Sequence, residues 1–293
     1  MLELITAYGD PPLEDDTPAA ARARRQARLR PPTEPIHDRR DLDAGGVPAR
    51  LYRPNDDDGL GLLVYFHGGG WVLGSVDGHD NLCRILANRA GAAVLSVDYR
   101  LAPEHPFPAA LEDAVAATRW AHAQAGELGA DPQRLAIGGD SAGANLAAVV
   151  AQLAPVPLRF QLLLYPATDL RCGRPSYVEH ADGYVLTSAG VLWFVGHYLS
   201  GGQSAPDDPR VSPILAEDAA LRATPPALVV TAEYDPLRDE GWAYADRLRE
   251  VGVEVSTVHY DSMMHGFMSL SDFLDDGKAA LAVAGDALAA ALA

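Results

Sequence analysis

Residues 134–150 read RLAIGGDSAGANLAAVV, and the fold can be worked out from this stretch outward. Its first part, RLAIGG (134–139), is an apolar run typical of a buried strand, and residues 142–154 are small and apolar enough for a buried helix. Between them GDSAG (139–143) matches G-x-S-x-G, a strand-to-helix turn that raises a serine hydroxyl above the edge of a sheet. Glycine loses much conformational entropy on folding, so a glycine on each side of Ser141 indicates that side chains there would clash. The pattern predicts a sharp turn with Ser141 at its tip.

The alternation of strand and helix continues on both sides of this turn. Short apolar or alternating runs predict strands, and longer segments of mixed polarity predict helices. Besides 134–139, the expected strands are 47–54, 62–66, 92–97, 160–165, 227–232 and 253–260, and the expected helices are 79–90, 108–125, 142–154, 237–251, 272–292 and one that begins at Thr17-Pro18. Strands that alternate with helices form a mostly parallel sheet covered on both faces. An α/β fold is therefore predicted, with residues 1–293 as a single domain.

One long stretch interrupts this rhythm. Residues 167–224 contain no strong strand pattern and carry several turn clusters, with one short apolar helix expected at 186–199. A segment of this length inside a compact α/β domain is usually functional. We expect it to lie over the carboxyl edge of the sheet, where open α/β sheets bind ligands, and to form a helical cap with residues 1–45.

Composition and charge exclude several classes of protein. The 40 acidic residues against 23 Lys and Arg give a net charge of −17, which disfavours binding to nucleic acid. No signal peptide and no membrane-spanning run are visible, so a cytoplasmic protein without membrane contact is expected. The two cysteines, Cys83 and Cys172, are expected as free thiols. The run DDDG (56–59) is interpreted as a turn because adjacent carboxylates cannot converge on one ion, and no metal is expected.

A serine hydroxyl becomes a nucleophile only when a base takes its proton. After a turn of this kind the acid and the histidine follow in chain order, each at the end of a later strand. Asp235 comes directly after ALVVTAEY (227–234), and His265 follows VEVSTVHY (253–260) after a short loop. The order predicts Ser141, Asp235 and His265 as the catalytic residues.

Other acids and histidines fit these roles less well. His259 lies within an expected strand and is more typical of a structural residue. Glu233 would point to the other face if its strand continues, and Asp239 falls in the following helix. These three residues are therefore alternatives to the predicted acid and base.

The segment HGGGW (67–71) follows the expected strand at 62–66. Glycines let backbone N–H groups approach a developing negative charge without obstruction by side chains. Gly68, Gly69 and Gly70 are therefore candidate oxyanion-hole donors together with the N–H of Ala142. A phosphate-binding loop is excluded, because Leu73 stands where G-x-G-x-x-G needs its last glycine and no G-K-[ST] follows.

With these motifs in view, the chain resembles the hormone-sensitive-lipase-like esterases of the α/β-hydrolase superfamily. The resemblance covers nearly the whole chain and rests on HGGGW (67–71), DYRLAPEHPFPAALED (98–113), GDSAGAN (139–145), EYDPLRDEG (233–241) and HGF (265–267). It implies an α/β-hydrolase fold with a mostly parallel eight-stranded sheet, helices on both faces and a mobile helical cap.

The resemblance also implies roles for single residues. Ser141 would be the nucleophile, His265 the base and Asp235 the acid that orients it. Ala144 departs from the family, which usually has glycine there, and we expect this change to be tolerated. Asp98 and Arg100 are expected to pair beneath the HGGGW loop.

Together these observations predict a serine esterase that hydrolyses carboxylic esters of short to medium acyl chain through an acyl-enzyme, without a cofactor. Trp71, Trp193, Phe194 and Met264 are the candidate walls of an apolar substrate pocket. The expected partner is a small-molecule ester, and a homodimer is left open. Two alternatives also stay open. One is an amidase or lactonase that uses the same three residues, and the other is a non-catalytic small-molecule receptor, which the presence of His265 disfavours.

Overall fold

The computed structural model of the chain describes residues 11–182 and 184–293, so residues 1–10 of the predicted cap lie outside the described residues. The strands are β1 (Asp38–Asp43), β2 (Pro48–Arg53), β3 (Leu60–Phe66), β4 (Ala93–Val97), β5 (Ala130–Asp140), β6 (Phe160–Leu164), β7 (Ala227–Tyr234) and β8 (Val255–Met264). The α-helices are α2 (Pro18–Ala27), α3 (Asp80–Ala90), α4 (Ala109–Ala123), α5 (Ala142–Leu153), α6 (Ser176–Glu179), α7 (Ser188–Tyr198), α8 (Asp218–Arg222), α9 (Arg238–Glu250) and α10 (Asp275–Ala291). Short 3₁₀ turns are η1 (Leu13–Asp15), η2 (Ala125–Leu128), η3 (Pro213–Leu215) and η4 (Phe267–Leu270).

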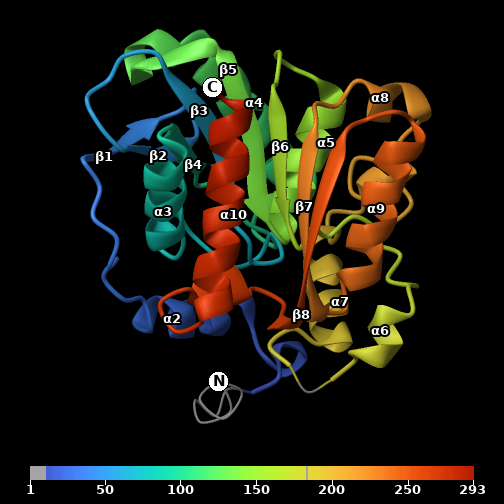
Figure 1. Ribbon diagram of the computed structural model, residues 1–293. Helices are drawn as coiled ribbons and strands as arrows, with labels where there is room; N and C mark the ends of the chain where they lie inside the picture. The colour runs from blue at the N-terminus through green and yellow to red at the C-terminus, as the bar shows by residue number, and fades with distance from the viewer. Residues whose placement is uncertain (1–10, 183) are drawn as a thin grey trace.

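The strands form one eight-stranded sheet in the order β1-β2-β4-β3-β5-β6-β7-β8 (Figure 1). β2 pairs antiparallel with β1 and β4, and every pairing from β4 to β8 is parallel. The predicted fold, a mostly parallel eight-stranded sheet of the α/β-hydrolase type, is therefore confirmed.

The sheet has an apolar core on each face. In β3, Leu62 and Val64 belong to the core shared with α4, α5 and α9, whereas Leu63 and Tyr65 belong to the core shared with α3 and α10. Successive side chains of a strand point to opposite faces, so a strand covered on both sides is apolar throughout. This burial explains the continuous apolar run at 62–66.

Two strands differ from the expectation. β1 was not predicted, because its sequence DRRDLD has no apolar alternation and five of its six residues are charged. It is an edge strand that pairs only with β2. β8 extends to Met264, so His265 follows the strand directly and not after a loop.

The N-terminal helix begins where the sequence predicted. Pro18 is at its first position, and the Thr17 hydroxyl accepts a hydrogen bond from the Ala20 N–H at 3.2 Å. Figure 1 shows α2, α6 and α7 together at the lower end of the sheet, beyond the carboxyl ends of the parallel strands. These helices come from the two segments that were expected to form the cap.

Two further expectations concern the whole chain. Cys83 and Cys172 are both free thiols, as predicted. Over residues 11–182 and 184–293, none of the helices combines the length and the apolar character needed to cross a bilayer.

Candidate active site

The strand-to-helix turn at Ser141 has the geometry that its glycines suggested. Ser141 adopts φ 56° and ψ −118°, a region that residues with a side chain seldom occupy. A Cβ atom added to Gly139 or Gly143 would collide with the Phe66 carbonyl oxygen at the end of β3. The absence of both side chains therefore allows β5 and α5 to meet at this tight angle.

Ser141, His265 and Asp235 lie in one chain of hydrogen bonds. The distance from Ser141 Oγ to His265 Nε2 is 2.8 Å, and the distance from His265 Nδ1 to Asp235 Oδ2 is 2.7 Å. The three residues follow β5, β8 and β7, whose parallel carboxyl ends meet at one edge of the sheet. In this arrangement His265 can take the proton of the serine while Asp235 stabilises the imidazolium that forms.

The environment of the acid and the base limits their movement. The Asp235 side chain is buried, and its second oxygen, Oδ1, accepts the Leu237 N–H at 2.8 Å. The ring of Tyr165 lies edge-on to the ring of His265 at a centroid distance of 4.9 Å. Such contacts hold an imidazole in one orientation before substrate arrives.

The three alternative residues are engaged elsewhere. His259 contacts Thr231 Oγ1 through Nδ1 at 2.9 Å and Glu233 Oε2 through Nε2 at 3.0 Å. Glu233 also accepts a hydrogen bond from Arg238, and Asp239 accepts the Ser176 N–H at 2.9 Å. Neither ring nitrogen of His259 is therefore directed to Ser141.

Not all of the proposed oxyanion donors are available. Gly68 donates its N–H to Asp140 Oδ1 at 2.8 Å, so this group does not point to the reacting carbonyl. Among the described residues, no hydrogen-bond acceptor is found for the N–H groups of Gly69, Gly70 and Ala142. Gly69 and Gly70 have φ values of 125° and 63°, which glycine adopts without strain. Of the four candidate donors, these three N–H groups therefore have no acceptor among the described residues.

A buried polar network lies directly behind this loop. The Asp140 carboxylate accepts hydrogen bonds from Tyr65 Oη and Gly68 N, both at 2.8 Å, and lies 3.2 Å from His79 Nε2. Burial would raise the pKa of Asp140, but the charge of His79 and the donated hydrogen bonds lower it below its usual value. Burial likewise disfavours protonated His79, yet the Asp140 carboxylate raises the pKa of His79 above its usual value. The sequence patterns did not predict this network, although an aspartate inside G-x-S-x-G indicates a charge that needs a partner once it is buried.

A neutral histidine, His67, lies in the loop itself. Arg100, which was expected to pair with Asp98 beneath the loop, has a different partner. Burial lowers the pKa of His67 to about 3, and its Nδ1 is 2.9 Å from the Gly68 carbonyl oxygen. Arg100 does not pair with Asp98; it binds Asp113 of α4 through Nη2 at 2.7 Å and Nε at 2.9 Å. The expected Asp98–Arg100 pair is wrong, because α4 brings the Asp113 carboxylate, which the guanidinium binds with two nitrogens.

A cavity of about 680 Å³ opens above Ser141. Trp71 and Phe194 line it, as expected for two of the candidate walls. Trp193 and Met264 are not among the described residues that line it. Trp193 is one position along α7 from Phe194 and packs on His197 with a ring distance of 4.4 Å, whereas Met264 is buried at the end of β8. The α2 side of the cavity carries polar side chains, and the α7 side is apolar.

Glu240 is a buried acid at the wall of this cavity. Burial raises its pKa to about 8, even though the Thr168 N–H and the Tyr177 hydroxyl donate hydrogen bonds to it at 2.7 and 2.9 Å. In the unfolded chain a glutamate has its usual value of 4.5. The folded protein therefore retains a proton between pH 4.5 and about 8 that the unfolded chain has released.

This difference predicts how stability depends on pH. The free energy of unfolding should fall as pH rises through that window, by about 1.4 kcal/mol for each unit of pKa difference and on the order of 5 kcal/mol in all. Glu240→Gln has the same shape without a proton to lose, so its stability should fall less between pH 5.5 and 8.5. Urea unfolding at several pH values measures this, with the exposed Glu250→Gln on the same helix as the control. Parallel curves for wild type and Glu240→Gln would contradict the prediction.

Several known proteins similar to this chain are named as ester hydrolases. The alpha/beta hydrolase fold family model matches residues 63–269. The chain is 49% identical over 247 residues to the carboxylic ester hydrolase LipN of Mycobacterium tuberculosis, an alignment that covers 81% of this chain and 65% of that relative. It is 42% identical over 254 residues to an ethyl acetate hydrolase of Pseudomonas putida, covering 84% of this chain and 79% of that protein.

A solved structure resembles it over almost its full length. The thermostable esterase of Pseudomonas putida superposes with a TM-score of 0.93 at 40% identity, covering 100% of this chain and 95% of that one. These names agree with the sequence prediction of an ester hydrolase.

Proposed function

This chain belongs to the alpha/beta hydrolase family, and on that premise we propose that it is a carboxylic ester hydrolase in which Ser141 is acylated and then deacylated by water. The relatives named above support the reaction class, since they are ester hydrolases at 42–49% identity. The observation that carries the proposal is the continuous hydrogen-bonded chain from Ser141 through His265 to Asp235 at the floor of the cavity.

The first half of the reaction forms the acyl-enzyme. Ser141 Oγ attacks the ester carbonyl carbon while His265 Nε2 takes the hydroxyl proton. The carbonyl oxygen becomes an oxyanion, which accepts hydrogen bonds from the N–H groups of Gly69, Gly70 and Ala142. The carbon–oxygen bond to the alcohol then breaks, and His265 returns the proton to the leaving alcohol.

The second half repeats this chemistry with water. His265 takes a proton from a water molecule, and the hydroxide attacks the acyl carbonyl. The oxyanion forms at the same place, and its collapse breaks the bond to Ser141 Oγ, which recovers the proton. The products are a carboxylic acid and an alcohol, and neither half needs an oxidant or a metal ion.

We propose short to medium acyl chains as the substrates. A cavity of about 680 Å³ lies within the roughly 300–1,000 Å³ range of small-molecule sites. Its apolar side chains on α7 suit a hydrocarbon group, and the relative named as an ethyl acetate hydrolase is consistent with a short ester.

We further propose that α2 and residues 167–224 act as a cap, since both contribute walls to the cavity. Location in the cytoplasm stays a prediction of the sequence, and a homodimer stays open.

An aryl acetate assay tests this function. Mixing the protein with a nitrophenyl acetate should release a rapid burst of about one nitrophenolate per chain, followed by steady turnover, because acylation by an ester with so good a leaving group is expected to be faster than deacylation. The acyl chain is then lengthened from acetate to laurate, with kcat/KM expected to fall at the long end. The absence of both a burst and turnover with every ester tested would refute the proposal. Hydrolysis of the matching anilide at a similar rate would favour the amidase alternative.

A further inference from the structure

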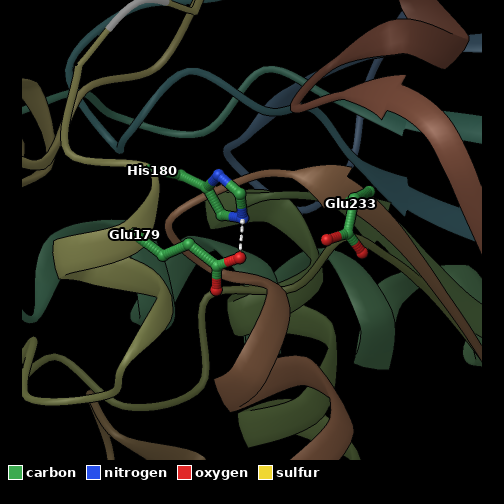
Figure 2. Close-up of side chains that lie close together, drawn as sticks. All are labelled: Glu179, His180 and Glu233. Carbon is green, nitrogen blue, oxygen red and sulfur yellow. Dashed lines mark ion pairs between the residues drawn. The ribbon is translucent and has the colours of Figure 1, made fainter.

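Three side chains that resemble a metal site lie beside the active site. Figure 2 shows Glu179 and His180, from the end of α6, close to Glu233 at the end of β7. One ligand atom from each lies within 4.8 Å of the others. The cation that these atoms share is the guanidinium of Arg238, which is 2.7 Å from Glu179 Oε2, 2.9 Å from His180 Nε2 and 2.8 Å from Glu233 Oε1. The cluster is therefore built around an arginine.

The two residues after Arg238 bind the same part of the chain. Asp239 Oδ2 accepts the Ser176 N–H at 2.9 Å. Glu240 Oε1 accepts the Thr168 N–H at 2.7 Å, and Glu240 Oε2 accepts the Tyr177 hydroxyl at 2.9 Å. All three consecutive side chains at the start of α9 thus hold residues 168–180, which follow β6 and form one wall of the cavity.

The same short stretch contains the candidate acid. The Arg238 N–H donates to the Asp235 carbonyl oxygen at 3.1 Å, and the Leu237 N–H donates to Asp235 Oδ1 at 2.8 Å. The remaining oxygen, Asp235 Oδ2, faces His265. Two backbone N–H groups at the start of α9 therefore contact Asp235, one at its carbonyl oxygen and one at its carboxylate, so a displacement there would act on this residue.

We propose that Arg238 is a positioning residue that links the 168–180 segment to Asp235. Through this link, the position of the segment at the cavity wall determines the geometry of the Asp235–His265 hydrogen bond. The effect of Arg238 on turnover depends on the ester hydrolysis proposed above, whereas its effect on that hydrogen bond does not.

The chemistry of the side chain suits this role. A planar guanidinium offers several donors at fixed angles, so Arg238 can bind α6, β7 and its own helix at the same time. The cation also lies over the Trp242 ring, with 5.1 Å between the guanidinium carbon and the ring centroid. Lysine is a point charge on a flexible chain and would satisfy only part of this set.

The test compares Arg238→Met, Arg238→Lys and Glu179→Ala. Arg238→Met should lower kcat by about 10- to 100-fold with less than about a threefold change in KM, because a small displacement of an orienting group can cost a hundredfold. Arg238→Lys should recover part of the loss. Glu179→Ala, at an exposed position of α6, removes one of the two contacts that Arg238 makes to the 168–180 segment, leaves the contact to His180, and should lower kcat by a few fold. Arg249→Met is the control, since Arg249 lies on the same helix and binds Asp246, Val255 and Thr257.

Two readouts separate positioning from general stability. In proton NMR, the hydrogen shared by Asp235 and His265 should give a far-downfield resonance in wild type and in Arg249→Met that is lost or moved upfield in Arg238→Met. In a double-mutant cycle, Asp235→Asn alone should cost about 10⁴-fold in kcat, and adding Arg238→Met to it should cost less than about twofold more.

The outcomes are distinct. If Arg238→Met lowers only the melting temperature while kcat and the resonance are retained, or if its cost in kcat is undiminished in Asp235→Asn, Arg238 is not a positioning residue. If wild type hydrolyses no ester but the resonance is lost in Arg238→Met, the proposed function fails and the link to Asp235 stands. The Glu179→Ala result applies even where Arg238→Met folds poorly, and an unchanged kcat and resonance there overturn the link.

Discussion

Ser141→Ala should lower kcat for aryl acetates by about a millionfold, which leaves only the slow reaction that binding and the oxyanion donors sustain. The hydroxyl oxygen is the atom that forms the bond to the acyl group in the proposed reaction. In the structure this oxygen is 2.8 Å from His265 Nε2. The loss should appear in kcat and in the burst together, and both are measured by stopped-flow release of nitrophenolate.

The variant should still fold. The Ser141 N–H donates to the Leu164 carbonyl oxygen at 2.8 Å, and this backbone contact does not need the hydroxyl. The positive φ of the turn is as costly for alanine as for serine, so circular dichroism and the melting temperature should be close to those of wild type. Ser262→Ala is the matched control, because the Ser262 hydroxyl contacts Asp276 on the exposed side of β8. Retention of more than about 1% of the rate in Ser141→Ala would assign the nucleophile to another residue.

His265→Ala should be almost as damaging as the loss of the serine, at about 10⁶-fold in kcat. Without the imidazole, nothing takes the proton of Ser141 or returns it to the leaving alcohol. The two residues act as one unit, so the double variant Ser141→Ala with His265→Ala should be no slower than either single variant. Steady-state rates with the same aryl ester provide the comparison.

His259→Asn is the control for this prediction. His259 precedes His265 by six positions and was the competing base in the sequence, but its contacts are to Thr231 and Glu233. Its replacement should change kcat by less than about threefold. A large loss in His259→Asn with a small loss in His265→Ala would exchange the roles assigned to the two histidines.

Much of the site could be predicted because its signals are local. The glycines around Ser141 reflect contacts within one turn, since a side chain at either would meet the Phe66 carbonyl oxygen. Asp235 and His265 each follow a strand, and the carboxyl ends of parallel strands necessarily share one edge of the sheet. The three positions were therefore brought together by the fold class alone.

The errors arose where an element or side chain depends on a partner that its own sequence does not specify. β1 is a polar strand that forms because β2 offers it an edge, and nothing in DRRDLD indicates this. Arg100 binds Asp113 and not Asp98 because the fold brings this residue of α4 to the guanidinium. The Gly68 N–H is directed to Asp140, which no spacing within HGGGW foretells.

The sequence by itself determined the alternating sheet, the sharp turn at Ser141 and the order of the serine, acid and histidine, because apolar periodicity and missing side chains act over a few neighbouring residues. Only the tertiary structure decided which backbone N–H groups are left for an oxyanion, which side chains line the cavity, and that Arg238 joins the 168–180 segment to the stretch that carries Asp235. Those outcomes depend on contacts between segments far apart in the chain. There, each polar group bonds to the partner that the packing of the fold places within hydrogen-bond distance.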